Sequence, residues 1–140
     1  MTKILFVCTG NSVRSQMAEG FARYYARDQF EISSAGTHPV GVNPYALQVM
    51  NEVDIDISDQ TSDPLSDFSV QDFDCVVTLC DSARDSCPVI PTGIESHHWP
   101  LPDPASLTVK SSEIIQAFRL VRHQVEQNIK ALLVTLTETS

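Results

Sequence analysis

Apolar residues along the chain fall into short runs that alternate with longer stretches in which they recur every three or four positions. Short runs bounded by turn residues predict buried strands, and the longer pattern predicts amphipathic helices. Strands are predicted at residues 3–7, 30–34, 75–79 and, with the weakest pattern, 95–99. Helices are predicted at residues 15–27, 43–53 and from Ser111 or Ser112 onward. Strands that alternate with helices in this way indicate an α/β fold, a three-layer sandwich whose central four-stranded parallel sheet is covered on both faces.

The C-terminal helix has the most regular pattern. Its predicted inward-facing residues are Ile114, Ile115, Phe118, Val121, Val125, Ile129 and Leu132 or Leu133. This spacing predicts a long final helix.

Turn and breaker residues separate the predicted elements. Residues 33–36 predict a turn after the second strand, and Asn43-Pro44 predicts an N-cap followed by a first-turn proline. The acidic segment 54–72 predicts turns and one short helix at residues 64–69. Residues 80–87 predict a loop or a loose helix, which the prolines that follow would end.

Composition narrows the classes of function. The chain has 140 residues, enough for one domain (residues 1–140), and no apolar run long enough to span a membrane. Its net charge of −9 and pI near 4.6 argue against nucleic-acid binding, so a bound anion would need a local positive pocket. The first strand follows Met1 too closely for a secretory leader, so a cytoplasmic protein is expected. In that compartment the four cysteines are expected to serve redox or nucleophilic chemistry rather than structural disulfides.

One stretch between the first predicted strand and helix is suited to holding an anion. It contains Cys8, the small or polar loop Thr9, Gly10, Asn11, Ser12 and Val13, and then Arg14 and Ser15. Loop N–H groups, the positive end of the following helix and the Arg14 guanidinium favour a bound tetrahedral oxyanion. The same surroundings favour the Cys8 thiolate as a nucleophile, with Ser15 as a hydroxyl donor to its sulfur. Gly10 and Asn11 tolerate the left-handed backbone that inward-turned N–H groups require.

The alternative for this stretch is a buried cysteine at a strand end and an arginine on a helix surface. It explains neither the spacing of the two residues nor the polar loop between them, so we favour the anion-binding interpretation.

Parallel strands bring their carboxyl ends to one edge of the sheet, where ligands bind. Cys8 follows the first predicted strand, Cys80 follows the third and Asp103 follows the fourth, so we expect all three at this edge. By local chemistry alone, Asp103 is better explained as the residue that starts a turn before Pro104.

The stretch from Cys8 to Ser15 resembles the phosphate-binding loop of the low-molecular-weight protein tyrosine phosphatase fold. The resemblance extends over essentially the whole chain to the thioredoxin-coupled arsenate reductase branch of that fold. The motifs that carry it are Cys8-Thr9-Gly10-Asn11-Ser12 with Arg14-Ser15-Gln16-Met17-Ala18-Glu19-Gly20, Ser34-Ala35-Gly36, Val42-Asn43-Pro44, Glu52 through Ser58, Thr61-Ser62-Asp63, Val77-Thr78-Leu79-Cys80, Cys87-Pro88 and Asp103-Pro104-Ala105. This set is far more specific than the loop, which alone would indicate only a phosphatase-like protein.

The resemblance implies an enzyme that reduces arsenate to arsenite. The Cys8 thiolate would attack arsenate held by Arg14 and the loop, and Asp103 would protonate the departing oxygen. Cys80 would then attack Cys8 as arsenite leaves, and Cys87 would attack Cys80 and pass the disulfide to thioredoxin. If the segment joining the last two cysteines were helical, their Cα atoms would lie ~10 Å apart. A disulfide allows about 4.4–6.8 Å, so the segment would have to unwind.

Two other functions stay open at this point. A phosphatase of the same fold would need only the nucleophile, the arginine and the acid, leaving the other thiols idle. Such phosphatases usually follow the Asp-Pro pair with tyrosines, whereas this chain has Ala105, Ser106 and Leu107. A non-catalytic oxyanion-binding or redox-sensing protein is disfavoured, because the nucleophile, the arginine, the acid and both relay thiols are all present.

The resemblance also implies a metal site. Asn11, Glu19, Ser34 and Asp63 match positions that bind a potassium ion in some arsenate reductases of this type, although all four are also ordinary hydrogen-bonding residues of loops. No tightly bound cofactor is implied, the expected partners are arsenate and thioredoxin, and a monomer is expected. Glutaredoxin as the reductant stays open.

Other cysteine, histidine and loop positions have simpler interpretations. Cys75 lies within the third predicted strand and is expected in the core. His97 and His98 would face opposite sides of a strand and so could not share a zinc ion, which predicts one in solvent and the other beneath the loop. Val13 stands where some relatives have a cysteine, and no step of the reaction depends on that thiol.

Overall fold

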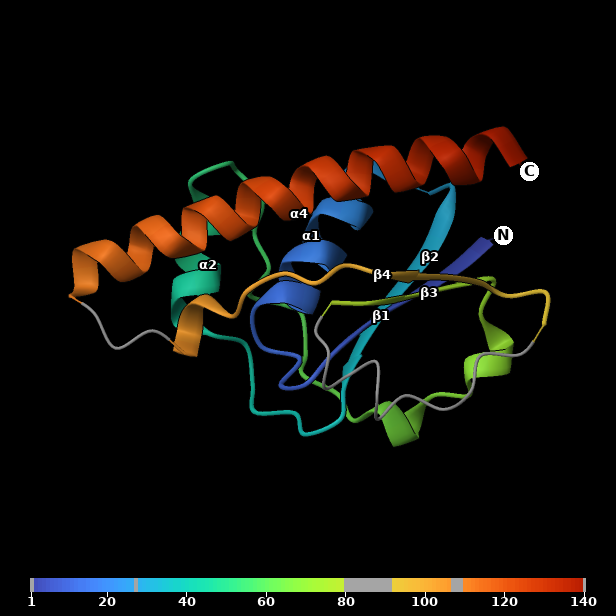
Figure 1. The fold of residues 1–140 in the computed structure, drawn as a ribbon, viewed down its shortest axis with the longest axis horizontal. Coiled ribbons are helices and arrows are strands. Elements are labelled where there is room, and N and C mark those ends of the chain that lie inside the picture. The colour runs from blue at the N-terminus through green and yellow to red at the C-terminus, as the bar shows by residue number, and fades with distance from the viewer. Residues whose placement is uncertain (1, 27, 80–91, 107–109, 140) are drawn as a thin grey trace.

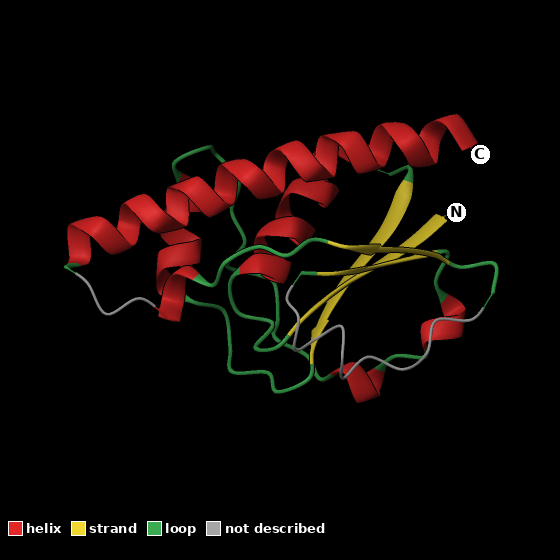
Figure 2. Cartoon of the chain, viewed as in Figure 1, coloured by secondary structure: helices red, strands yellow, loops and turns green. Residues whose placement is uncertain are grey.

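The computed structural model describes residues 2–26, 28–79, 92–106 and 110–139 (Figure 1). The strands are β1 (Thr2–Cys8), β2 (Phe30–Gly36), β3 (Cys75–Thr78) and β4 (Glu95–His98). The α-helices are α1 (Arg14–Ala26), α2 (Pro44–Asn51) and α4 (Ser111–Thr139). The short 3₁₀ helices are η1 (Leu65–Asp67), η2 (Val70–Asp72) and η3 (Pro104–Ser106). Figure 2 shows the strands gathered in one sheet with helices on either side of it.

The strands form one parallel sheet in the order β2-β1-β3-β4. The inner strand β1 is fully buried from Ile4 to Val7. At its end, Cys8 pairs with Gly36 on β2, while Thr78 on β3 pairs with His98 on β4. The carboxyl ends of the strands therefore meet at one edge of the sheet. Cys8 lies at this edge, at the end of the inner strand β1. The predicted α/β fold with a four-stranded parallel sheet is confirmed.

Helices cover the sheet unequally. In Figure 1, α1, α2 and α4 lie together on one side of the sheet, and η1 and η2 lie on the other. The apolar stripe predicted for α4 faces inward, since Phe118, Val125 and Ile129 are fully buried. Phe21 of α1 and Phe6 of β1 belong to the same core. Within the described part of the chain, no helix is both long enough and apolar enough to cross a membrane.

Some boundaries differ from those predicted. The turn predicted at residues 33–36 is wrong, because β2 continues through Gly36 and pairs with β1 along its whole length. Helix α2 ends at Asn51, two residues earlier than predicted, and the acidic segment contains two 3₁₀ helices instead of one short helix. The predicted loop or loose helix at residues 80–87 lies outside the described residues.

A cluster of charged residues ties the end of α2 to α4. Glu52, directly after α2, accepts hydrogen bonds from Arg119 Nη2 at 2.7 Å and from Arg122 Nη1 at 2.7 Å. Arg122 also donates to the carbonyl oxygen of Val49 at 2.8 Å. The hydrogen bonds from Arg119 and Arg122 lower the pKa of Glu52 from 4.5 to about 2.

The variant Glu52→Gln is expected to lower the free energy of unfolding at neutral pH, because two arginines lose their carboxylate partner. A carboxyl group whose pKa is lowered by folding stabilises the protein above its unfolded pKa, and that contribution disappears as the pH falls toward 2. Urea unfolding measured from neutral pH down to about pH 2 should therefore show the two proteins converging at the acid end. The exposed Glu31 of β2 offers a control, since Glu31→Gln should change stability little at any pH. A wild-type advantage that persists undiminished at the acid end would contradict the assignment.

Candidate active site

The loop between β1 and α1 turns its carbonyl groups outward. Thr9 O accepts from His38 N at 2.8 Å, Gly10 O from Val40 N at 3.0 Å and Ser12 O from Asn43 N at 3.0 Å. The other two loop carbonyls are also occupied: Asn11 O accepts from Gln16 Nε2, and Val13 O accepts from Met17 N. In a planar trans peptide, the C=O of one residue and the N–H of the next point in opposite directions. The N–H groups of residues 10–14 therefore point to the inner side of the loop, as an anion cradle requires.

Cys8 lies at the base of this loop, 2% exposed, with its Sγ atom 3.1 Å from Ser15 Oγ. Asn11 Nδ2 donates to the same Ser15 oxygen at 2.7 Å. Because Ser15 Oγ accepts from Asn11, its own proton is available for donation to the Cys8 sulfur. The predicted pairing of Ser15 with Cys8 is present in the structure.

Asn11 stabilises the conformation of the loop through its backbone and its buried side chain. Its φ of 45° is the left-handed conformation that was expected at Gly10 or Asn11, and Gly10 itself does not adopt it. The Asn11 side chain is fully buried, donates to Ser34 Oγ at 2.9 Å and accepts from Asp63 N at 2.9 Å. Asn11 therefore braces the loop, with its side chain turned into the protein.

The end of β2 approaches the loop so closely that only glycine fits there. A Cβ atom on Gly36 would lie 2.8 Å from Thr9 O and 2.9 Å from Asn11 N, both of them backbone atoms. Gly36→Ala is therefore expected to displace the loop and to weaken the affinity for a tetrahedral oxyanion such as phosphate about tenfold or more. Titration with phosphate, followed by calorimetry, would measure this.

Gly93 provides the matched control for this variant. Its φ is +98° and a Cβ atom there would meet nothing within 4 Å. Gly93→Ala should lose roughly 1 kcal/mol of stability through backbone strain. Its affinity for phosphate should stay at the wild-type value. Equal loss of anion affinity in both variants would mean that Gly36 does not position the loop.

Arg14 reaches the edge of the sheet from the first turn of α1. Its Nη1 donates to Leu101 O at 3.0 Å, and its Nη2 lies 3.8 Å from Asp103 Oδ2. Its Nε is buried and has no hydrogen-bond partner among the described residues. A buried donor without a partner costs about 1–3 kcal/mol, which a negatively charged oxygen in the cradle would relieve. Arg14 is thus placed to bind an oxyanion.

Asp103 has one carboxylate oxygen in a turn and the other near Arg14. Its Oδ1 accepts from Ala105 N at 3.0 Å, which is the turn expected before Pro104 and the start of η3. Its other carboxylate oxygen faces Arg14 across the edge of the sheet. The structure therefore brings Asp103 together with Arg14 at the candidate site.

The remaining predicted catalytic residues, Cys80 and Cys87, lie outside the described residues. The last described residue before them is Leu79, whose N–H donates to Val7 O at 2.9 Å. The chain thus leaves β3 beside the strand that ends at Cys8.

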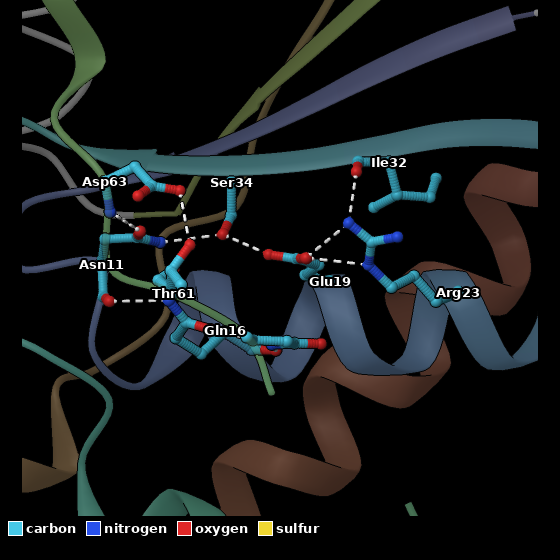
Figure 3. Close-up of polar contacts among 9 residues, drawn as sticks. Asn11, Gln16, Glu19, Arg23, Ile32, Ser34, Thr61 and Asp63 are labelled. Carbon is cyan, nitrogen blue, oxygen red and sulfur yellow. Dashed lines mark hydrogen bonds and ion pairs between the residues drawn. The ribbon is translucent and has the colours of Figure 1, made fainter. Parts of the chain in front are cut away.

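A chain of buried polar contacts runs behind the loop (Figure 3). Ser34 Oγ donates to Glu19 Oε1 at 2.6 Å, and the second Glu19 oxygen accepts from Arg23 Nε at 2.8 Å. Arg23 Nη2 also donates to Ile32 O at 2.8 Å. These contacts link α1 to β2 through a carboxylate that is 8% exposed. Arg23 was not predicted, since an arginine near a helix end gives no sign in the sequence of a buried partner.

The same region tests the predicted potassium ligands. Glu19, Ser34 and Asp63 line a cavity of about 430 Å³, and Asn11 contacts two of them. Carboxylate and hydroxyl oxygens suit a hard cation. Arg23 already neutralises Glu19, and the Ser34 proton is directed at Glu19, so a cation would have to redirect that hydroxyl. With that adjustment, the donor set fits a hard monovalent ion.

Gln16 is a second supporting residue that the pattern did not reveal. It is fully buried, and its Nε2 donates to Asn11 O and to Thr61 O, both at 2.9 Å. Its Oε1 accepts from Gln60 Nε2 at 2.8 Å. A glutamine in the first turn of an amphipathic helix normally faces solvent, so its position along the chain did not indicate this role.

Cys75 and the two histidines contact groups on β3 and β4. Cys75 is fully buried in β3, as predicted, and burial, followed by the charges of Glu95 and Asp74, raises the pKa of its thiol to about 12. His97 Nε2 lies 2.9 Å from Glu95 Oε2, and His98 Nδ1 lies 2.9 Å from Thr78 Oγ1. Both histidines are half-buried. The prediction that one of them faces solvent is therefore wrong, because each packs against its own partner on the sheet.

Comparison with known proteins gives consistent matches over the whole chain. The family model for low molecular weight phosphotyrosine protein phosphatase matches residues 3–140. The chain is 47% identical over 127 residues to the arsenate reductase of Shouchella clausii, which covers 91% of each protein. It superposes on a solved arsenate reductase in the oxidized state with a TM-score of 0.84 and 38% identity, covering 96% of this chain and 98% of that one. For a thioredoxin-dependent arsenate reductase of Corynebacterium glutamicum, the TM-score is 0.79 at 28% identity, over 100% of this chain and 64% of that one.

Proposed function

The chain belongs to the low molecular weight phosphotyrosine protein phosphatase family, and from this membership we propose that it is an arsenate reductase that uses thioredoxin as its reductant. The observation that carries the proposal is the loop after β1, whose carbonyls all point outward while the Cys8 sulfur at its base contacts Ser15. Such a loop holds a tetrahedral oxyanion against a nucleophilic thiol. Near-complete coverage of arsenate reductases then favours arsenate as that anion.

Binding comes first in the proposed reaction. The N–H groups of residues 10–14 and Arg14 Nε, which has no hydrogen-bond partner among the described residues, take the oxygens of arsenate and so bring the arsenic atom next to Cys8. Ser15, held by Asn11, stabilises the attacking thiolate. The thiolate forms a bond to arsenic, and one arsenate oxygen leaves as water after Asp103 protonates it.

Reduction then transfers two electrons from sulfur to arsenic. Cys80 attacks the Cys8 sulfur, the pair of electrons in the sulfur–arsenic bond passes to arsenic, and arsenite leaves a Cys8–Cys80 disulfide behind. Cys87 next attacks Cys80, which frees Cys8 and forms a Cys80–Cys87 disulfide. The dithiol of thioredoxin reduces this disulfide and restores the enzyme. Both relay residues lie outside the described part of the chain, so the support for this sequence of steps is the similarity to arsenate reductases, one of them thioredoxin-dependent.

A coupled assay tests the proposal. The protein is incubated with arsenate, thioredoxin, thioredoxin reductase and NADPH, and arsenite is measured beside NADPH oxidation. We expect one arsenite for each NADPH over many turnovers, with slow hydrolysis of p-nitrophenyl phosphate as a side activity. Steady phosphate-ester hydrolysis without any arsenite would instead identify a phosphatase, the second function that the family supports.

The proposed role of Asp103 as a proton donor can be separated from its role in the turn. In the variant Asp103→Asn, the side-chain amide oxygen would still accept the hydrogen bond from Ala105 N, but the amide would carry no acidic proton. We therefore expect this variant to lower kcat for arsenate reduction about 10²-fold or more, with little change in thermal stability or phosphate inhibition. Asp103→Ala should lower kcat similarly and also destabilise η3. An Asp103→Asn enzyme with wild-type kcat would assign Asp103 to the turn alone.

Three further properties belong to this proposal. The protein acts as a cytoplasmic monomer. Glu19, Ser34 and Asp63, which line one cavity, would hold a potassium ion together with the neighbouring Asn11, and the ion would supply positive charge behind the loop. A rise in melting temperature with potassium but not with a large organic cation would support that site, and an equal response to both would exclude it.

A further inference from the structure

Three metal-binding side chains meet on one face of the sheet, at the end opposite the loop. The sulfur of Cys75, a carboxylate oxygen of Glu95 and a ring nitrogen of His97 all lie within 4.8 Å of one another. The strand register explains why. Cys75 on β3 pairs directly with Glu95 on β4, and His97, two residues further, points to the same face.

This set of donors suits a particular class of ion. A thiolate, an imidazole and a carboxylate are the ligands that zinc prefers, and three of them with one open position form a common zinc arrangement. Donor atoms around one tetrahedral zinc ion lie about 3.3–3.8 Å apart, so separations within 4.8 Å need only small side-chain movements. The geometry points to a binding site for zinc or a similar borderline divalent ion, formed by Cys75, Glu95 and His97.

The surroundings leave room for such an ion to enter. Cys75 is fully buried, whereas the side chains of Glu95 and His97 are 37% and 34% exposed, so the ion would approach from the histidine side. A cavity of about 160 Å³ next to His97 is lined also by Asn128 and Thr135 of α4, and a water there can complete the coordination. On binding, the thiol releases its proton to solvent, and His97 Nε2 exchanges its contact with Glu95 for the ion.

The site is separate from the proposed arsenate chemistry. Cys75 pairs with Ile4 of β1, and Cys8 lies four residues further along that strand, or about 13 Å at the rise of a β-strand. Zinc bound here would tie β3 to the edge strand β4 without occupying the oxyanion loop.

A variant with a single thiol tests the site. Cys8, Cys80 and Cys87 are changed to serine in the full chain, which leaves Cys75 alone of the four cysteines. Co²⁺ is added as the probe, because bonding to a thiolate gives an intense near-ultraviolet charge-transfer band. We expect this band to appear and to be removed by excess Zn²⁺. Adding His97→Ala should lower the affinity for Co²⁺ about tenfold or more. The adjacent His98→Ala, on the opposite face of the strand, should leave it unchanged.

The results of these metal-binding experiments either support or exclude the proposed zinc site. No band in a folded single-thiol chain, or a band equally lost in the His97→Ala and His98→Ala variants, would overturn the site. If the single-thiol chain does not fold, Zn²⁺ titration of the reduced wild type and of His97→Ala gives the same answer, since the other three thiols are common to both. The wild type should then bind one more zinc ion per chain, and equal stoichiometry would exclude the site.

Discussion

A chain with serine in place of Cys8 is expected to produce no arsenite. A serine hydroxyl at neutral pH is not ionised, so the cradle would hold arsenate next to a group that cannot attack it. Serine also cannot form the first disulfide, so no electrons can reach arsenic even if a slow attack occurred. Loss of the nucleophile should lower kcat by a factor of about 10⁴ or more. Arsenite release in the coupled assay measures this directly.

The Cys8→Ser chain should still fold and bind anions, since the loop is shaped by its outward carbonyls and by Asn11. Phosphate should therefore raise its melting temperature by the same amount as we expect for the wild type. Ser15→Ala provides a graded comparison, because it removes only the hydrogen bond to the sulfur and should lower kcat far less. Arsenite turnover that survives in the Cys8→Ser chain would place the nucleophile elsewhere.

Much of the fold could be predicted because its signals are local. The stripe of α4 repeats at helical spacing, and residues such as Phe118 and Ile129 are buried as that spacing requires. Alternation of strands and helices likewise predicts parallel pairing, which all strand pairs of the described sheet show. The weak pattern of β4 reflects its place at the edge of the sheet, where it pairs only with β3.

The end of β2 could not be predicted from local preference. Serine and glycine at residues 33–36 favour turns, but in the fold they lie beside the oxyanion loop and pair with β1 up to Cys8. Gly36 is needed there because Thr9 O and Asn11 N leave no space for a side chain. Tertiary packing thus requires a turn-forming residue within a strand. The local sequence pattern does not contain this information, because the requirement comes from a contact with another element.

The residues of the candidate site also differ in whether the sequence alone predicts them. Cys8, Arg14 and Ser15 lie within one short stretch, so their spacing alone indicated an oxyanion loop. Gln16 supports that loop through Thr61, which lies far along the chain, and Arg23 links α1 to Ile32 of the neighbouring strand β2. Such contacts between elements exist only once the fold is formed.

The histidines illustrate the same limit. Adjacent residues on a strand face opposite ways, so His97 and His98 are not expected to share a zinc ion. Strand register instead places His97 beside Cys75, which lies more than twenty residues earlier. A search for metal ligands by spacing along the sequence would miss such a set.

Replacement of Cys87 by serine is expected to limit the enzyme to one arsenite per chain. Cys8 and Cys80 can still form a disulfide and release arsenite once, but no third thiol is present to free Cys8. Multiple turnover with thioredoxin should therefore stop, while a burst equal to the enzyme concentration remains. Rapid-quench measurement of arsenite gives the burst, and peptide mapping of the product should find Cys8 joined to Cys80.

The matched variant Cys80→Ser should abolish the burst as well, because no thiol then attacks Cys8 and arsenic stays bound to it. The two variants thus assign an order to the relay, since the second cysteine is needed for release and the third only for recycling. Phosphate-ester hydrolysis by Cys8, which needs no second thiol, should survive in both and shows that the loop is intact. Undiminished turnover in either variant would remove that cysteine from the relay, and in both it would leave only a direct attack by thioredoxin on the adduct at Cys8.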